Sequence, residues 1–396
     1  MRILLVCEPG ADGAFRHVEA LISHLLARKH AVAFAFSTKR GSHGQVRLLQ
    51  SFEDSGGMGV DLLTANKPTP SDIFAIAKLL VLVRRFRPDI IHCHSSKAGV
   101  LGRLAAIFAG VPAVYTPHAY FGMGIKRTSR TGLFNQIERW LAGIGQTINV
   151  SEDEALFARS HLSVKSSRQT VIPNAVDPHV FKPATAEGKR HWRRAKNLPE
   201  GAIVFGSLGR LSYQKDPLTL YRAFEIVARK HPATYLAHLG TGEFEKECEE
   251  WIQRAGLGER IVRMDYSPEP SDFYRGLDVF VLSSRYEGLS IAVLEALATD
   301  LPLVVTDVPG NRDFLRLGLS HVWSAPAEAP DALAVAMEAC LLDLENGRRS
   351  NHRAVALERF SEEVCFGKIL DLYREIGDSR RKQHSLASSA SKVIQT

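Results

Sequence analysis

The sequence predicts an α/β protein built of two doubly wound domains in tandem, and three observations carry this prediction. Short apolar runs alternate with stretches whose apolar residues recur at helical spacing, which is typical of a parallel sheet covered by helices on both faces. The alternation stops at a segment rich in Pro, Asn and Asp, residues 168–183, and then starts again. The length of 396 residues exceeds what one compact core can hold and suits two domains.

The first half of the chain alternates strands and helices. We expect the helix Gly13–Arg28 because the apolar residues between Phe15 and Leu26 fall on one stripe. The expected strands are Ile3–Cys7, Ala31–Phe36, Asp89–His94, Ala113–Thr116 and Thr147–Val150, and the other expected helices are Ser71–Phe86, Gly99–Ala109 and Thr131–Ile144. This order indicates a first parallel sheet with helices on both faces.

The second half repeats the pattern. The expected strands are Ile203–Gly209, Tyr235–Leu239, Ile261–Met264, Val279–Ser283 and Leu303–Thr306. The expected helices are Asp216–Lys230, Phe244–Ala255, Pro270–Gly276, Ser290–Thr299, Pro330–Leu344 and Ser361–Ile376, and the Ser-, Lys- and Arg-rich tail from Ser379 is expected to be disordered. Because such sheets bind ligands beyond the carboxyl ends of their strands, we expect the site in a central cleft that the two domains face.

The composition excludes several classes of protein. Hydrophobic residues make up 45% and charged residues 23%, which is ordinary for a globular protein and excludes a disordered or low-complexity chain. No apolar run approaches the roughly 18–20 residues of a membrane-spanning helix, and the run before Glu8 is too short for a signal peptide. The 5 cysteines are odd in number and widely spaced, which disfavours disulfides and a zinc site and favours the reducing cytoplasm.

Charge is distributed unevenly between the two halves. Residues 1–170 contain 21 Lys and Arg against 12 Asp and Glu, whereas residues 171–396 contain 29 against 31. A basic first half can face nucleic acid, an anionic bilayer or an acidic substrate, or can simply be a soluble surface.

The most informative segment is 281–298, where an expected strand runs through a loop into an expected helix. Gly288 allows close approach of the backbone, Ser290 suits the N-cap, and the free N–H groups at the helix start can hold a diphosphate. Glu287 lies at the loop rim and Glu295 farther along the helix, so the two carboxylates can bind different hydroxyls of one ligand. The alternative is a surface glutamate and an ordinary helix glutamate.

A second segment, Gly209–Pro217, also joins a strand to a helix. Arg210 offers a fork for phosphate oxygens and Lys215 a mobile point charge, while Asp216 and Pro217 suit the cap and first position of the next helix. The pair is therefore a candidate cationic clamp. The alternative is solvated loop charge.

The first half offers weaker candidates. His118 follows a strand end, and His92 and His94 end the preceding strand, but no carboxylate or cysteine completes a metal-ligand spacing, so we expect no metal. The turn from Glu8 to Gly13 fails the dinucleotide-binding fingerprint, which disfavours a nicotinamide enzyme, although the amide of Gly13 can still approach a phosphate.

Taken together these features resemble the retaining family 4 glycosyltransferases of GT-B architecture. The matching parts are Glu287-x7-Glu295, the pair Arg210 and Lys215, the crossing segment Val171–Asp177, Gly240-x-Gly242 and His118. The stretches 92–99 and 115–121 look like the bacterial members that build exopolysaccharide, capsule or lipopolysaccharide. The resemblance covers the chain to about residue 376.

The resemblance implies that the two domains bind different substrates. Residues 1–170 would bind the acceptor, residues 171–360 would bind the nucleotide sugar, and the helix 361–376 would pack back on the first domain, leaving 379–396 as the tail. The region 168–183 and the region near Phe360 would be the hinges of domain closure.

The resemblance also implies roles for single residues. Arg210 and Lys215 would bind the diphosphate, with an amide of Gly13 from the opposite domain, and His118 would contact the donor sugar. Glu287 would hold the sugar and phosphates, and Glu295 the ribose. The remaining donor-binding positions would be the amides of Gly288, Leu289 and Ser290, the turn residue Gly242, and Arg263, Met264 and Asp265 at the base.

Two departures from the family pattern stand out. The turn Gly10–Gly13 lacks the frequent adjacent glycine pair, and Pro309 stands where a glycine is common. No Asp-x-Asp motif lies in a plausible site, which predicts a metal-independent enzyme without cofactor.

We therefore expect a hexosyltransferase that moves a hexose from a UDP-hexose or GDP-mannose to a lipid-linked or oligosaccharide acceptor with retention, in surface polysaccharide biosynthesis. The basic clusters Arg84, Arg85 and Arg87, and Lys126, Arg127 and Arg130, predict a peripheral position on an anionic membrane at its cytoplasmic face. The alternatives are another GT-B enzyme, such as a phosphorylase or a sugar-nucleotide epimerase, and a non-catalytic binder of sugar nucleotides or nucleic acid; we expect no nucleic-acid partner.

Overall fold

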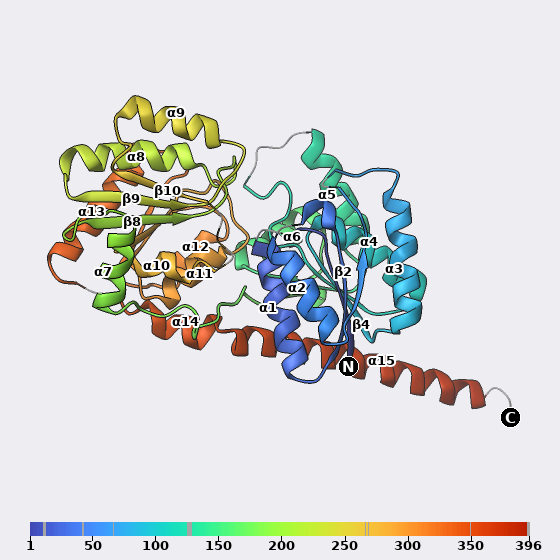
Figure 1. Cartoon of the computed structure of the whole chain (residues 1–396). Helices are drawn as coiled ribbons and strands as arrows, with labels where there is room; N and C mark the ends of the chain where they lie inside the picture. Colours follow the sequence, from blue (N-terminus) through green and yellow to red (C-terminus); the bar gives the residue numbers. More distant parts are fainter. Residues whose placement is uncertain are drawn as a thin grey trace.

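The computed structural model describes residues 1–10, 13–41, 43–65, 67–124, 129–265, 267, 269–348 and 350–393, without the side chains of 43, 53, 129–131 and 382–393. It confirms two α/β domains, each with its own parallel sheet (Figure 1). No described helix combines the length and the apolar character that a bilayer-spanning segment requires.

The first domain has a sheet of seven parallel strands in the order β3-β2-β1-β4-β5-β6-β7. Its strands are β1 (Arg2–Cys7), β2 (Ala31–Phe36), β3 (Met58–Asp61), β4 (Ile90–His94), β5 (Ala113–Thr116), β6 (Gln146–Asn149) and β7 (Gln169–Val171). The central strand β1 is paired on both sides, with Leu5 opposite Phe34 on β2 and opposite His92 on β4. The sheet ends at Val171, one residue beyond the predicted domain boundary.

Helices cover both faces of this sheet. One face packs on α3 (Asp72–Phe86), α4 (Ser96–Ala109) and α6 (Glu152–Leu162) through residues such as Leu79, Leu101 and Leu162. The other face packs on α1 (Gly13–Ala27), α2 (His43–Asp54) and the last helix, α15 (Glu362–Val393). The remaining elements are α5 (Ser129–Leu141) and two short 3₁₀ turns, Thr38–Arg40 and Ser166–Arg168.

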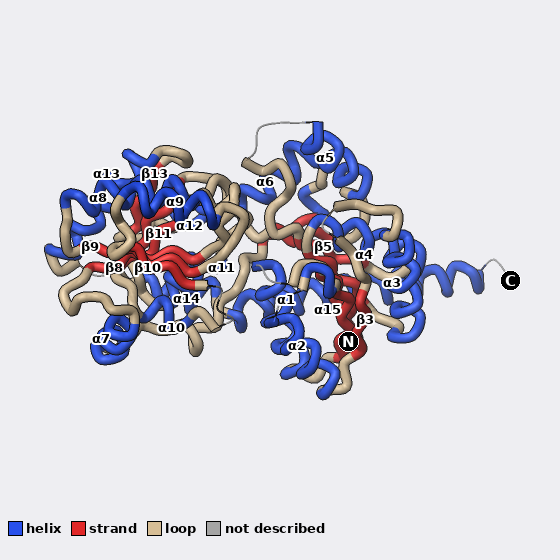
Figure 2. Tube along the Cα trace, turned by 45° about the horizontal axis from the view of Figure 1, so that its top comes forward, coloured by secondary structure: helices blue, strands red, loops and turns tan. Residues whose placement is uncertain are grey.

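The second domain has six parallel strands in the order β10-β9-β8-β11-β12-β13. Both sheets therefore share the strand order of a nucleotide-binding fold, in which the order reverses beside the first strand. The strands are β8 (Ile203–Leu208), β9 (Thr234–Leu239), β10 (Ile261–Met264), β11 (Val279–Leu282), β12 (Leu303–Thr306) and β13 (Val322–Ala325). The turned view in Figure 2 shows each sheet in red, enclosed by its helices.

The helices of the second domain also form two layers. One face packs on α8 (Pro217–Lys230), α9 (Glu245–Ala255) and α13 (Pro330–Glu345). The other packs on α7 (Ala186–Ala195), α10 (Ser271–Arg275), α11 (Ile291–Ala298), α12 (Asn311–Arg316) and α14 (His352–Phe360).

Most expected elements are present, and the ones missed share a weak apolar signal. The edge strand β3 reads Met-Gly-Val-Asp and is exposed or half-buried throughout, so it lacks the apolar run that marks a buried strand. The sequence of α7 is dominated by charged residues. Elements α2, α6, α12, α14, β7 and β13 were also not predicted. The helix α15 continues to Val393, where we had expected a disordered tail from Ser379; no proline interrupts it.

The chain crosses between the domains twice, and the two crossings lie side by side. The N–H of Val176 donates to the carbonyl oxygen of Phe360 at 2.9 Å, and the N–H of Glu362 donates to that of Val176 at 3.2 Å. After this bridge α15 runs beneath the first domain (Figure 1) and buries Phe366, Ile369 and Tyr373 in its core.

Candidate functional site

The strand order places four loops at the interface between the domains. In the second domain the loops after β8 and β11 leave the sheet on either side of the point where the strand order reverses, and in the first domain the loops after β1 and β4 do the same. The carboxyl ends of strands at such a point form the usual crevice for ligands in these sheets. The candidate residues predicted from the sequence lie on these loops and on their neighbours.

The two motifs of the second domain are brought into direct contact. Lys215 Nζ lies 2.5 Å from Glu287 Oε1, and Ser284 Oγ donates to the same oxygen at 2.5 Å. The two loops are also joined through the backbone, because the N–H of Arg285 donates to the carbonyl oxygen of Gln214 at 2.8 Å. The side chain of Glu287 is only 6% exposed and that of Lys215 19% exposed. Glu287 is thus buried beneath the loop and does not lie at its rim as expected.

Arg210 differs from Lys215 in being exposed. Among the described residues its guanidinium has no ion-pair partner. The loop that carries it is supported by the turn at Gly240–Gly242: a Cβ on Gly242 would lie 2.4 Å from the carbonyl oxygen of Leu211, and the N–H of Leu211 donates to Thr241 at 3.0 Å. The turn therefore fixes the Arg210 loop, and only glycine fits at Gly242.

The start of α11 faces the first domain. Ser290 is its N-cap residue by position, as expected, but its hydroxyl makes no capping bond. A Cβ on Gly288 would lie 2.9 Å from the amide nitrogen of Ala119, and one on Gly13 would lie 3.6 Å from Ile291 Cδ1. The N-terminal ends of α1 and α11 thus face each other across the interface. Both carry the positive end of a helix dipole and free N–H groups, which together favour an anion.

Glu295 is held by two residues that were not predicted from the sequence, Tyr274 and Arg16. Its side chain is 1% exposed, Tyr274 donates its hydroxyl to Oε2 at 2.7 Å, and Arg16 Nη2 of the first domain lies 2.5 Å from Oε1. Both carboxylate oxygens are therefore engaged in this conformation. Arg16 lies in the first turn of α1, and nothing in its local sequence distinguishes it from an ordinary helix surface arginine.

The predicted His118 is half-buried and belongs to a cluster with the buried imidazoles of His17 and His94. His118 Nε2 lies 3.0 Å from His94 Nδ1, and the ring of His17 lies 4.8 Å from that of His118, centroid to centroid. Burial lowers the pKa of His17 to about 4 and lowers the pKa of His94 and His118 well below the ordinary value, with neighbouring histidines adding to the effect. The rings are therefore neutral at neutral pH.

The third nitrogen near those of His94 and His118 belongs to His17 and not to His92. The ring of His92 packs on that of His94, with 4.0 Å between centroids, but its own nitrogens lie 2.5 and 2.8 Å from the hydroxyl oxygens of Tyr373 and Thr116. Ligand nitrogens of His17, His94 and His118 lie within 4.8 Å of one another. Neutral imidazoles at that spacing are a set that a transition metal can use, so a metal-independent site stays a prediction.

The turn that carries His118 has an unusual backbone. His118 and Ala119 have φ values of 56° and 101°, a left-handed conformation that costs a residue with a side chain about 1–3 kcal/mol. The N–H of Ala119 donates to Glu154 Oε1 at 2.6 Å, and the N–H of Val150 donates to Oε2 at 2.6 Å. Burial raises the pKa of Glu154 to about 7, although both N–H groups act in the opposite direction.

Glu154 was also missed, and here the sequence holds a signal. Ser151 and Glu154 have the spacing of a capping box at the start of α6, and the N–H of Glu154 does donate to Ser151 Oγ at 3.1 Å. The neighbouring Asp153 contacts the second domain, where Gly310 N–H donates to it at 3.2 Å and Arg316 pairs with it at 2.5 Å.

The three residues expected at the base lie on the rim of the second domain. Arg263 Nη2 lies 3.0 Å from Glu245 Oε1, and the carbonyl oxygen of Met264 accepts the N–H of Gly240 at 2.9 Å, whereas Asp265 is exposed. The Gly240 turn thus joins them to the Arg210 loop. They do not touch the Lys215–Glu287 pair.

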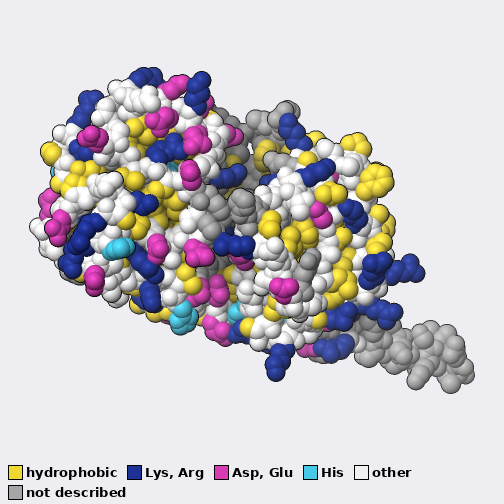
Figure 3. All heavy atoms as spheres, viewed as in Figure 1, with side chains coloured by type: hydrophobic (Ala, Val, Ile, Leu, Met, Phe, Trp, Pro, Cys, Tyr) yellow, Lys and Arg dark blue, Asp and Glu magenta, His cyan; other side chains and the backbone are white. Residues whose placement is uncertain are grey.

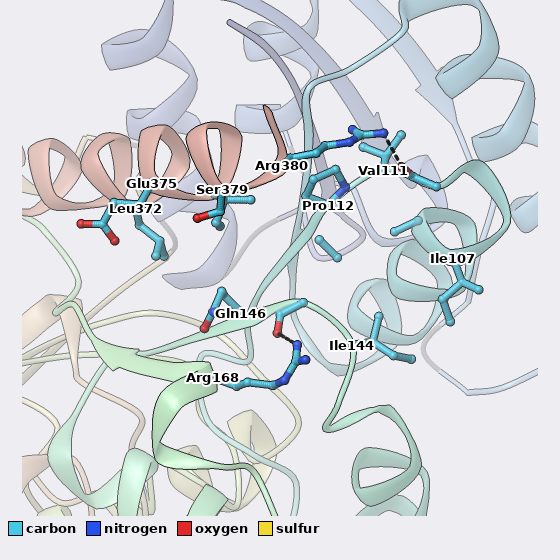
Figure 4. Close-up of a pocket in the computed structure, with 15 residues that line it drawn as sticks. Ile107, Val111, Pro112, Ile144, Gln146, Arg168, Leu372, Glu375, Ser379 and Arg380 are labelled. Carbon is cyan, nitrogen blue, oxygen red and sulfur yellow. Dashed lines mark hydrogen bonds between the residues drawn. The ribbon is translucent and has the colours of Figure 1, made fainter. Parts of the chain in front are cut away.

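A separate surface pocket lies at the opposite end of the first domain (Figure 4). It is formed where β5 and β6 begin, next to α15, and so at the amino ends of the strands. Its two arginines are engaged with the backbone: Arg380 donates to the carbonyl oxygen of Gly110 at 2.7 Å and Arg168 to that of Gly145 at 3.4 Å. This pocket lies away from every candidate residue, so we place the site at the domain interface.

Comparison with known proteins agrees with this architecture. Residues 11–180 match the family model described as Glycosyltransferase Family 4, and residues 188–355 match the one described as Glycosyl transferases group 1. An Escherichia coli protein named UDP-Gal:alpha-D-GlcNAc-diphosphoundecaprenol alpha-1,3-galactosyltransferase is 31% identical over 257 residues, which are 64% of this chain and 66% of that protein. A Bacillus subtilis protein named as glycosyltransferase EpsD is 25% identical over 80% of this chain and 84% of its own length.

Solved structures show the same fold. Anabaena HepE in complex with UDP and glucose has a TM-score of 0.79 at 20% identity, covering 94% of this chain and 99% of that one. WaaG, a glycosyltransferase involved in lipopolysaccharide biosynthesis, has a TM-score of 0.70 at 14% identity, covering 94% and 99%. The two family models together account for most of the chain, one for each domain, and the strand orders agree with them; the chain belongs to glycosyltransferase family 4 and has the two-domain GT-B fold.

Proposed function

We propose that this protein transfers a hexose from a nucleotide diphosphosugar to a lipid-linked glycan acceptor with retention of the anomeric configuration, in the assembly of a surface polysaccharide. The observation that carries the proposal is the Lys215–Glu287 pair, 2.5 Å apart. Arg210, which has no ion-pair partner among the described residues, lies on the same loop as Lys215, and Glu287 lies just before the start of α11. These groups supply positive charge and N–H donors at one point of the interface.

The diphosphate is the part of the donor that this arrangement suits best. The exposed guanidinium of Arg210 is available to phosphate oxygens, and Lys215 can move its ammonium from Glu287 toward them. The N–H groups of Gly288, Leu289 and Ser290 stand at the positive end of α11, with the start of α1 opposite. As the bond to the sugar breaks, charge grows on the leaving diphosphate, and fixed cations stabilise it there.

His118 would contact the donor sugar. Its ring is neutral at neutral pH because burial lowers its pKa, so it can donate one hydrogen bond and accept another. Its backbone touches Gly288, which places it next to the loop that would hold the phosphates. The neutral ring orients a hydroxyl without adding a charge beside the diphosphate.

The nearby carboxylates bear on the route to retention, because a two-step route needs a carboxylate that is free to attack the anomeric carbon. Glu287 pairs with Lys215, Glu154 accepts two backbone N–H groups, and Asp153 pairs with Arg316. None of these three is free to form a covalent intermediate. In the route we propose, the acceptor oxygen bonds to the anomeric carbon on the face that the diphosphate leaves, and its proton passes to the departing phosphate oxygen.

The donor would be a UDP-hexose, with GDP-mannose as the second choice. The E. coli relative is named for UDP-Gal, and HepE was solved with UDP and with glucose. A thermal-shift panel of UDP-galactose, UDP-glucose, GDP-mannose, UDP and GDP tests this, because a ligand that binds the folded state raises the melting temperature. Stabilisation by a nucleotide sugar, followed by release of its nucleoside diphosphate on turnover, is the expected result. No shift with any of the five would contradict the proposal.

The same assay separates the alternatives. Release of a sugar phosphate would identify a phosphorylase, and a changed sugar on an intact nucleotide would identify an epimerase. We expect neither. Turnover in the presence of a chelator should equal turnover without it, and a loss that added divalent cation restores would overturn the prediction of metal independence.

A membrane position is supported by the outer edge of the first domain. On α3 the side chains of Ile73 and Phe74 are each 71% exposed, and Arg84 and Arg85 occupy its last turn. Figure 3 shows Lys and Arg side chains gathered beside apolar ones along this edge. Apolar side chains that enter a bilayer next to cations that attract its headgroups are typical of a peripheral protein. The other expected cluster, Lys126, Arg127 and Arg130, lies outside the described side chains.

Sedimentation with vesicles tests this position. We expect the protein to bind vesicles that contain anionic lipid, to bind them more weakly at high salt, and to lose much of this binding in the Phe74→Ser variant. Vesicle binding that does not depend on the anionic lipid content would contradict the membrane part of the proposal, but it would not affect the proposed sugar transfer.

A further inference from the structure

We propose that Glu154 is a positioning residue for the transfer reaction, which holds the left-handed turn His118–Ala119 so that His118 faces the donor sugar. The inference rests on the proposed function, because it takes His118 as the group that contacts the sugar. Its own support is the geometry around Glu154, which neither the sequence motifs nor the family comparison assigns.

The first step is the conformation of the turn. His118 and Ala119 are consecutive residues with positive φ, 56° and 101°, and neither is glycine. Such a conformation persists only where surrounding contacts hold it, because each residue would relax to negative φ on its own. Two residues strained in succession at the carboxyl end of a strand therefore require an external support.

The second step is that Glu154 supplies this support. The carboxylate is fully buried and stands in the first turn of α6, the helix that follows the neighbouring strand β6. Oε1 accepts the N–H of Ala119 at 2.6 Å, and Oε2 accepts the N–H of Val150, directly before the helix, at 2.6 Å. One carboxylate thus ties the strained turn to the end of β6. An ordinary capping-box glutamate would bond the N-cap amide and nothing farther away.

The third step concerns what the turn touches. The backbone of His118 and Ala119 approaches Gly288 so closely that a Cβ there would lie 2.9 Å from the Ala119 nitrogen. The preceding residue of α6, Asp153, accepts the N–H of Gly310 of the second domain, where a Cβ would lie 2.5 Å from the carbonyl oxygen of Gly288. The first turn of α6 therefore sets the position of both the histidine and the loop opposite it.

The test is Glu154→Gln, an isosteric change that keeps one acceptor oxygen and turns an NH₂ group toward one of the two amides. With UDP-galactose or UDP-glucose, whichever the wild type hydrolyses or transfers, we expect kcat to fall about 10- to 100-fold, the range expected when a reacting group is misplaced by about an ångström. The KM for the nucleotide sugar and the affinity for UDP should change less than about 3-fold, because the Lys215 side of the site is intact. Hydrogen exchange in residues 113–124 should accelerate.

Two further variants separate positioning from plain destabilisation. Thr185→Ala removes the hydrogen bond that caps α7, at 3.0 Å from the Gly188 N–H, and should lower the melting temperature while kcat stays within about 2-fold. Ala119→Gly removes the steric cost of φ 101°, so adding it to Glu154→Gln should restore part of kcat. If Glu154→Gln does not fold, Glu154→Asp provides the same comparison, since the shorter carboxylate cannot reach both amides.

The outcomes are distinct. A folded Glu154→Gln with wild-type kcat and wild-type exchange in residues 113–124 overturns the inference. So does a double variant no better than Glu154→Gln alone, because Glu154 would then not act through the turn. A wild-type protein that neither binds UDP nor turns over a nucleotide sugar would instead defeat the proposed function.

Discussion

The two domains contribute to the interface in different ways. The second domain presents charged side chains on two short loops, 209–216 and 283–290, which follow adjacent strands of its sheet. The first domain presents neutral imidazoles from α1, β4 and the turn after β5, together with two charged contacts to the second domain, Arg16 of α1 and Asp153 of α6. In the function we propose, the second domain supplies cations and helix-end N–H groups to the diphosphate, and the imidazoles of the first domain supply a shaped, uncharged surface to the part of the substrate that reacts.

From this difference we expect the second-domain half of the site to be sensitive to charge and the first-domain half to be sensitive to geometry. Removing an ammonium from the second domain removes an attraction directly. Changing a residue of the first domain acts through the shape of the His118 turn and the packing of the two domains. The following predictions separate these effects.

The largest effect is expected from Lys215→Ala. Loss of one preorganised cation at a developing charge commonly costs about 10²–10³ in kcat, so turnover of the nucleotide sugar should fall by that factor. The fold should survive, because the side chain of Lys215 is partly exposed and Glu287 keeps its bond from Ser284. Steady-state kinetics and a melting curve measure both quantities.

The matched control is Lys230→Ala. Lys230 belongs to the same domain and pairs with Glu338 at 2.8 Å, but its side chain is 59% exposed on α8, away from the interface. It should keep wild-type turnover. Equal losses in the two variants would mean that Lys215 acts only through the general charge of the domain.

Acid should destabilise the first domain more than the second. The folded-state pKa of His17 is about 4, below its ordinary value of 6.5, so between these values the unfolded chain binds the proton more readily. The stability that the neutral ring contributes is present above pH 6.5 and is lost as the pH falls toward 4, by about 3 kcal/mol for one such ring. His92, His94 and His118 shift in the same direction, whereas in the second domain His238 alone among the described histidines is lowered in this way.

The carboxyl groups offset part of this effect. Burial raises the pKa of Glu154 to about 7, so the folded state holds its proton from pH 7 down to the ordinary value of 4.5 and gains relative stability there. Native-state hydrogen exchange at pH 7.5 and pH 5 should therefore show a greater loss of protection in residues 1–170 than in 184–350. Equal losses in the two domains would contradict this.

An intermediate effect is expected where the domains touch. Gly288→Ala places a methyl group 2.9 Å from the Ala119 nitrogen, so the domains must separate or the turn must move. We expect turnover to fall about 10-fold or more, by the argument that small displacements of reacting groups are costly. Gly201→Ala is the control, because a Cβ there meets nothing within 4 Å, and it should behave as the wild type.

The smallest effect is expected from Arg16→Ala. Arg16 occupies one oxygen of Glu295, which the ribose hydroxyls would need, so removing it should tighten UDP binding by a few-fold while lowering the melting temperature. Arg28→Ala, directly after this helix, breaks the pair with Glu363 and the contact with His24, both away from Glu295, and should leave UDP binding unchanged. Calorimetric titration with UDP decides; weaker binding in Arg16→Ala would mean that Arg16 itself contacts the nucleotide.

The contrast between the domains also explains what could be predicted. Alternating apolar runs are enough to define two parallel sheets, and Lys215 and Glu287 could be found because each lies in a short contiguous motif after a strand. Arg16 and Glu154 could not be found in this way, since their partners, Glu295 and Ala119, lie far away in the sequence or across the interface. Glu295 was expected to bind ribose hydroxyls, and its pair with Arg16 could not be foreseen for the same reason, because burial by the opposite domain leaves no local trace.

The helix α15 affects how the protein can fold during its synthesis. Phe366 and Tyr373 complete the same core as Ile3 and Leu5, so the first strand to be synthesised can be covered only after one of the last helices has been synthesised. At about 5–20 residues per second, a ribosome needs roughly 20–70 s to cover that distance. Throughout that interval one face of the nascent N-terminal sheet lacks its cover, and that apolar surface is where chaperones would be expected to bind.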